Sequence, residues 1–173
     1  GEAVETTLES KAKASAAFSL LRGMERIPGK QEDGSINETV LLSWIQEVRE
    51  KASEKDRSII ADQHIGQILA HSSEDPEDGA WPHRVIRNVI DRLAAEQIEQ
   101  GLRIERFNMR GVYSKALFEG GQQEKALADE YRKWASILSY QWPRTSRVLE
   151  SIAETWEEDA RREDIHAEQR KLE

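Results

Sequence analysis

The sequence contains no cysteine, which excludes disulfide bonds, thiolate metal sites and cysteine nucleophiles. No apolar run approaches the roughly 20 residues that a membrane-spanning helix needs, and no signal-peptide pattern opens the chain. With only four prolines and ten glycines in 173 residues, the composition is not that of a disordered or linker-rich protein. These absences indicate a globular protein of one-domain length, and we expect it to be cytoplasmic.

Tryptophan is the exception in a chain that is otherwise poor in aromatic residues. Aromatic side chains make up 6% of the sequence, but five of them are tryptophans, and each buried tryptophan removes about 200 Å² from water. We predict that Trp44, Trp134 and Trp156 are buried, because each lies in an apolar stripe at helical spacing. Trp81 and Trp142 precede prolines at helix starts, and we predict that both are partly exposed.

Apolar residues recur at helical spacing between start and stop signals along the chain. This pattern predicts one all-α domain over residues 1–173, arranged as an irregular bundle or a short superhelix of about six helices. Because the chain begins with Gly-Glu rather than Met, we expect a domain excised from a larger protein. The predicted helices cover 3–26, 36–53, Ser53 to about His71, Pro82 to Gly101, 122–141 and a sixth from Pro143.

Two helix boundaries depend on particular residues. Ser35 and Glu38 have the spacing of a capping box, in which two side chains satisfy free amides at a helix start. Gly101 is expected to end the fourth helix in the left-handed conformation that glycine adopts easily. The residues after it alternate in polarity and reach a turn before Gly111, which predicts a small β-hairpin over 102–113.

No catalytic, cofactor or metal site is predicted, because the motifs that carry such chemistry are missing. His64 and His71 lie seven residues apart, about 10.5 Å along a helix, which is too far to share one ion. His71 and His83 flank an acidic loop, the best metal candidate, but a capped helix end with a solvated loop is the favoured interpretation. The carboxylates of that loop are Asp75, Glu77 and Asp78. We therefore expect that the protein is not an enzyme.

Positive charge is concentrated in residues 83–115, although the whole chain has a net charge of −8. This stretch holds seven basic and four acidic side chains, a net charge of +3. The expected helices and hairpin over 36–115 follow the order of a winged helix-turn-helix, which inserts a helix into the DNA major groove. Against this, about ten residues separate the third and fourth helices, whereas a tight motif has three or four. The candidate nucleic-acid contacts are Arg84, Arg87, Arg103, Arg106 and Arg110.

The last two predicted helices, over 122–172, are expected to form a two-helix hairpin. Beyond Trp156 the large apolar side chains disappear from the inward face of the sixth helix, and charged residues surround it. We expect this end to project from the body or to dock on a partner. Truncation after Ala160 is then predicted to shift the thermal midpoint by only a few degrees.

These patterns favour a non-catalytic interaction or regulatory module of a larger cytoplasmic protein, which we expect to be bacterial. Its expected partner is another protein or another domain of the parent chain, and no membrane is involved. The alternative hypothesis is a winged-helix variant that binds nucleic acid through the basic region 83–115.

Overall fold

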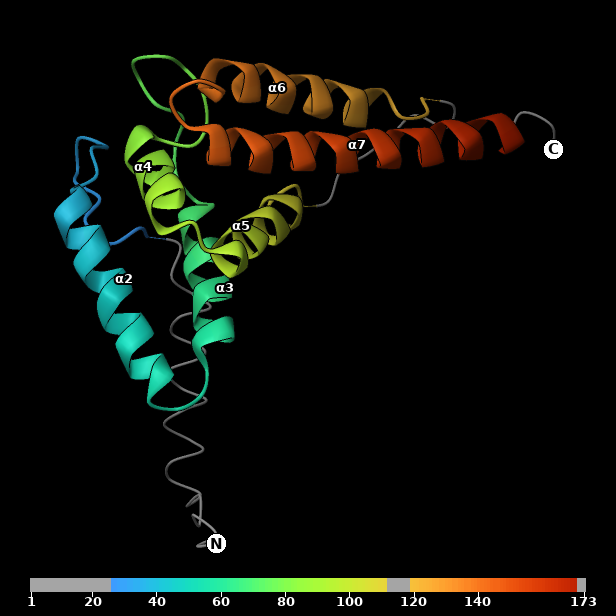
Figure 1. The fold of residues 1–173 in the computed structure, drawn as a ribbon. Coiled ribbons are helices and arrows are strands. Elements are labelled where there is room, and N and C mark those ends of the chain that lie inside the picture. The colour runs from blue at the N-terminus through green and yellow to red at the C-terminus, as the bar shows by residue number, and fades with distance from the viewer. Residues whose placement is uncertain (1–25, 112–118, 171–173) are drawn as a thin grey trace, which may run out of the picture.

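The structure is a computed structural model that describes residues 26–111 and 119–170 (Figure 1). Every regular element in these ranges is a helix, so the all-α prediction is confirmed. The helix predicted over 3–26 lies outside the described residues except for Arg26. The helices are α2 (Glu38–Ser53), α3 (Ser58–Leu69), α4 (Arg84–Leu93), α5 (Glu96–Asn108), α6 (Gln122–Leu138) and α7 (Pro143–Arg170).

The helices form two groups that meet at α4 and α5. In Figure 1, α6 and α7 lie side by side as an antiparallel pair. Helices α2 and α3 extend away from this pair as the two arms of a V, joined at its point by a short turn. Helix α5 crosses α3, and both α4 and α5 contact α7, so these two helices connect the V to the hairpin.

The fourth predicted helix is wrong in its extent, because two helices occupy its place. Helix α4 ends at Leu93, and Ala94 adopts the left-handed conformation with φ 49°. The Ala94 amide donates to the Ile90 carbonyl at 3.0 Å, which closes the last turn. A left-handed alanine costs about 1–2 kcal/mol, and the break lets α5 turn to cross α3. Since no glycine or proline marks the break, the sequence pattern continues through it.

The predicted β-hairpin over 102–113 is also wrong in the described residues, because α5 continues to Asn108. Its buried side chains, Ile98 and Leu102, are four residues apart, which is helical spacing. The alternation that suggested a strand comes from Leu102 and Ile104, of which Leu102 is buried and Ile104 is exposed on the helix. Residues 112 and 113 of the expected hairpin lie outside the described residues.

The start of α2 differs from the predicted capping box. Asn37 is the N-cap, and its side-chain oxygen accepts a hydrogen bond from the Val40 amide at 3.1 Å. The Ser35 hydroxyl instead donates to the Asp33 carboxylate at 2.7 Å, within the turn before the helix. The predicted Ser35 cap is therefore wrong: Asn and Ser are equally good N-caps, and the helix begins after Asn37.

The tryptophan predictions are right for three residues and wrong for two. Trp134 and Trp156 are buried, and Trp142 is partly exposed, as predicted. Trp81 is only 2% exposed and lies in the centre of the core, whereas Trp44 is half-buried on α2. Trp81 packs edge-on against Tyr131, with ring centres 6.1 Å apart, and also contacts Trp134. The core therefore includes the loop before α4, which the helical stripes could not show.

Within residues 26–111 and 119–170, no helix combines the length and apolar character needed to cross a membrane.

Candidate functional site

The five arginines proposed as nucleic-acid contacts each have a partner within the protein. Arg87 is the most deeply placed, with 0% of its surface exposed. Its guanidinium binds the Asp78 carboxylate, donates to the Pro82 carbonyl at 2.5 Å and lies 4.9 Å from the centre of the Trp142 ring. A cation held in this way stabilises the fold and is not presented to a phosphate.

Arg106, in the last turn of α5, and Arg110, just after this helix, extend towards the α6–α7 hairpin. Arg106 donates to the Tyr131 hydroxyl at 2.7 Å, and its guanidinium lies 4.3 Å from the centre of the Trp81 ring. Arg110 forms a 2.6 Å ion pair with the buried Glu124 and also covers the Trp156 ring. Cation–π contacts of this kind contribute about 0.5–2 kcal/mol each. Both side chains therefore attach α5 to the hairpin.

The remaining two arginines also bind neighbouring elements. Arg84 is paired with Asp75 and with Glu77 in the loop before α4. Arg103 on α5 donates to the Ser151 hydroxyl on α7 at 3.4 Å. The structure thus uses the five arginines in contacts between elements, two at the loop before α4 and three against the α6–α7 hairpin, and it does not gather them on one exposed face.

The acidic loop between α3 and α4 is more ordered than a solvated loop. Asp75 is buried and accepts hydrogen bonds from the backbone amides of Glu77 at 3.0 Å and Arg84 at 2.9 Å. Burial by itself raises the pKa of Asp75, but these amides and the Arg84 guanidinium outweigh it and lower the pKa to about 2. The hydrogen bond from Arg87 likewise lowers the pKa of Asp78, against the opposing effect of burial.

The two histidines that flank this loop have separate roles. The His71 Nε2 atom lies 3.3 Å from the Glu105 carboxylate on α5. The His83 side chain caps α4, where Nδ1 accepts the Val85 amide at 3.3 Å. In the part of the chain that the structure describes, no three His, Asp or Glu side chains are grouped so that they could hold a metal ion.

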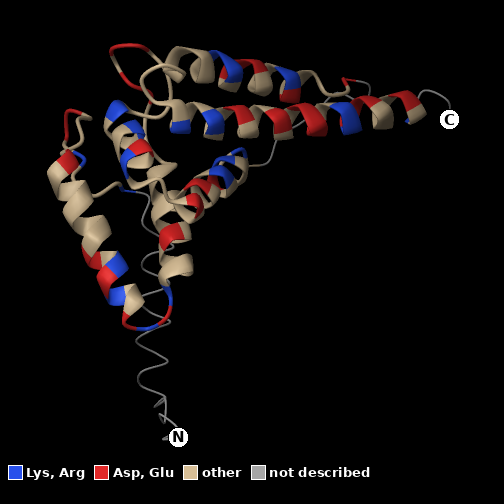
Figure 2. Cartoon of the chain, in the orientation of Figure 1, with Lys and Arg blue, Asp and Glu red and all other residues tan. Residues whose placement is uncertain are grey.

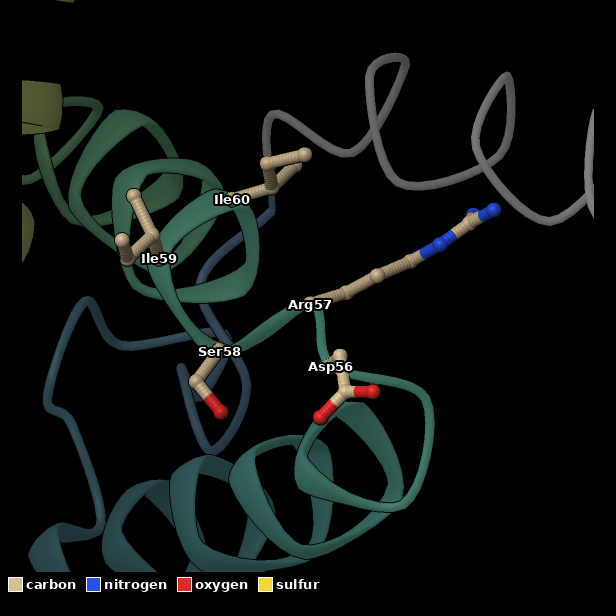
Figure 3. Close-up of a pocket in the computed structure, with 5 residues that line it drawn as sticks. All are labelled: Asp56, Arg57, Ser58, Ile59 and Ile60. Carbon is tan, nitrogen blue, oxygen red and sulfur yellow. The ribbon is translucent and has the colours of Figure 1, made fainter.

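An exposed apolar surface lies at the turn that joins α2 and α3 (Figure 3). Ile59 and Ile60, in the first turn of α3, are 63% and 49% exposed. They line an open depression of about 460 Å³ together with Asp56, Arg57 and Ser58. We call these five residues, 56–60, the apolar corner. Asp56 has φ 53°, a left-handed conformation in the turn between the end of α2 at Ser53 and the start of α3 at Ser58.

Sequence reasoning missed the apolar corner, because it considered only the inward stripe of the third helix. That stripe, which includes Ile65 and Leu69, is buried as expected. Ile59 is six residues before Ile65 and therefore falls on the other side of the helix. Two adjacent isoleucines that do not fit the stripe were the available signal.

Charge is otherwise mixed over the described surface. Figure 2 shows lysine and arginine alternating with aspartate and glutamate along α6 and α7, without a large region of one sign. Surface ion pairs such as Arg132–Glu157, at 2.8 Å, account for part of this pattern. Comparisons with known proteins give no match, whether to protein-family models, to curated proteins or to solved structures.

Proposed function

We propose that the chain is a non-catalytic interaction module that binds a protein partner through the apolar corner. The observation that carries this proposal is the exposure of Ile59 and Ile60 side by side at a helix start. Clustered exposed apolar side chains with a polar rim are typical of protein-binding surfaces. The rim here consists of Asp56 and Arg57, which line the same depression. The matching partner is a protein segment with an apolar face, in the same chain or another one.

The shape of the corner favours a protein over a small molecule. Small-molecule sites enclose most of their ligand and place a few polar groups around it from several elements. Among the described residues, those that line the depression at the corner are five consecutive residues of one turn and helix start (Figure 3). An open apolar depression with a charged rim suits a helix or loop of another protein.

The contacts of the charged residues support a non-catalytic role. Shifted pKa values often mark active sites, but structural ion pairs shift them as well. Asp75 and Asp78, whose pKa values are lowered, both bind arginines that fasten the loop to α4. Their shifts are therefore explained by the fold.

We also propose that the module belongs to a larger cytoplasmic protein of bacterial type. Sequencing of the parent gene tests this second proposal.

Site-specific photo-crosslinking tests the proposed surface. A photoreactive residue at position 59 or 60 should capture a defined protein in cells of the source organism. The same residue at Ile137 on α6 or Ile165 on α7, which are exposed apolar residues far from the corner in sequence, should not. Capture at all four positions alike, or at positions 137 and 165 alone, would contradict the proposal. The captured protein is then purified for binding measurements.

A further inference from the structure

His83 connects the loop before α4 to the helix itself. Its Nδ1 atom accepts a hydrogen bond from the Val85 amide at 3.3 Å, and the residue is 8% exposed. A ring nitrogen accepts a hydrogen bond only when it carries no proton. This N-cap therefore exists only while Nδ1 is unprotonated.

The backbone around His83 joins three parts of the molecule. The His83 amide donates to the Ser72 hydroxyl at 3.0 Å, and the Trp81 indole N–H donates to the Ser72 carbonyl at 2.9 Å. Trp81 in turn packs against Tyr131 and Trp134 on α6. These contacts connect His83 to the residues after α3, to the start of α4 and to the aromatic core.

The surroundings of His83 disfavour an additional positive charge. Burial is the largest cause that lowers the pKa of this ring below its ordinary 6.5. Asp75 opposes it, whereas Arg84 and Arg87 on α4 and Lys30 in the segment before α2 lower the pKa further. The Asp75 carboxylate is already bound by Arg84, with Nε and Oδ2 3.1 Å apart. A protonated His83 would thus be a fourth cation in this group, and the carboxylate that favours its charge, Asp75, is already bound by Arg84.

We propose that His83 is a pH-sensitive latch on the segment Ser72–His83. When the ring is neutral it caps α4 and helps to hold the segment against the helix, and when the ring is protonated the cap is lost and the segment opens locally more often. Because the folded protein favours the neutral ring, this stabilisation is complete above the unfolded-state value of 6.5. It decreases as the pH falls below that value, which is a range that cells and their compartments reach.

The experiment combines histidine titration with hydrogen exchange, both followed residue by residue by NMR between about pH 7.5 and pH 5. The His83 ring should titrate below 6.5. As it titrates, exchange at the Val85 amide and the Trp81 indole, corrected for intrinsic rates, should accelerate by about three- to tenfold. His83→Asn keeps an N-cap acceptor without a titrating group, and it should abolish the acceleration.

Two further variants separate the latch from other histidines. His166→Asn changes an exposed residue on α7 and should leave the acceleration intact. His71→Asn removes the contact with Glu105. In this variant the exchange at the Val85 amide should still accelerate as in the wild type when the pH falls. The latch is refuted if the pKa of His83 is found at or above 6.5. It is also refuted if the pKa is lower but the Val85 amide and the Trp81 indole keep their protection from hydrogen exchange as the ring titrates. The wild-type titration decides the matter even if His83→Asn fails to fold.

Discussion

Gly66 on α3 and Gly101 on α5 let the two helices cross with their backbones in contact. A Cβ atom built on Gly66 would lie 1.9 Å from the Ile98 carbonyl oxygen, and one built on Gly101 would lie 1.9 Å from the Gln63 carbonyl oxygen. Since each clash is with the backbone of the other helix, neither side chain can be accommodated by a rotamer change. Both glycines have ordinary helical φ values, so close approach alone requires them here.

Gly66→Ala and Gly101→Ala should each destabilise the protein by about 2–3 kcal/mol or more. At an exposed helical position the same change stabilises a helix by about 1 kcal/mol, so the sign of the effect distinguishes the two situations. Urea unfolding measures the free energy. Ala126→Gly at an exposed position of α6 is the control, with an expected loss of about 1 kcal/mol. An unchanged or increased stability of Gly66→Ala would show that α3 and α5 do not cross in this way.

Asp91 on α4 caps the start of α7, more than 50 residues away in the chain. Its carboxylate accepts hydrogen bonds from the amides of Arg144 and Thr145, both at 2.9 Å, and from the Thr145 hydroxyl at 2.6 Å. Asp91→Ala should lower the free energy of unfolding by about 2 kcal/mol, because hydrogen bonds to charged groups contribute about 1.5–3 kcal/mol. Asp129→Ala on the exposed face of α6 should change it by less than about 0.5 kcal/mol. Equal effects of the two variants would argue against the cap.

Trp81 should behave as a core residue in spite of its position in a loop. Trp81→Ala is expected to cost about 3–5 kcal/mol, because the ring contacts Tyr131, Trp134 and the Arg106 guanidinium. Trp142→Ala should cost less, since that ring is partly exposed. Iodide quenching of single-tryptophan variants checks the order independently. Trp81 should be the less accessible of the two, and faster quenching of Trp81 would contradict its placement.

The Asp75–Arg84 pair should make the protein sensitive to acid. The folded-state pKa of Asp75, about 2, lies below its ordinary 3.8, so the pair stabilises the fold above pH 3.8 and this contribution is lost as the pH falls towards 2. Asp75→Asn should therefore be less stable than the wild type near neutral pH and should lose less stability in that acid range. Urea unfolding over several pH values measures both. Parallel curves for the two proteins would show that Asp75 is not paired in solution.

The end of α7 is attached more firmly than its sequence suggests. The Gly121 amide donates to the Asp164 carboxylate at 2.9 Å, Lys125 binds the same carboxylate at 2.6 Å, and Ala167 is buried. The sequence predicted that truncation after Ala160 would shift the thermal midpoint by only a few degrees. From these contacts we now expect a loss of about 2 kcal/mol. Truncation after Ala167 should cost less, and equal midpoints for both truncations and the full chain would restore the original prediction.

The sequence predicted the helical class and most helix positions, because apolar spacing and helix-stop residues are local signals. It missed the break at Ala94 and the role of Gly101, since both depend on how α5 crosses α3. Gly101 resembles a helix stop in sequence, yet a glycine is also what two touching backbones require. Only the three-dimensional arrangement distinguishes these uses.

For a similar reason, the sequence could not show which groups bind the five arginines. A run of arginines forms a basic surface only if no carboxylates or aromatic rings lie close enough in the folded protein to bind them. Asp78, Glu124 and Trp81 are distant in sequence or belong to a loop, and the fold brings them to Arg87, Arg110 and Arg106. The apolar corner had a local signal in its two isoleucines, which lay outside the inward stripe.

The central claim is that the apolar corner binds a protein partner, and calorimetric titration with the captured protein tests it most directly. Ile59→Lys/Ile60→Lys should weaken binding by about 100-fold, since loss of a central apolar contact costs about 2–4 kcal/mol. Ile165→Lys, on the distant end of α7, should bind like the wild type, and both variants should keep the wild-type thermal midpoint within a few degrees. Wild-type affinity in the double variant, with the fold intact, would contradict the claim.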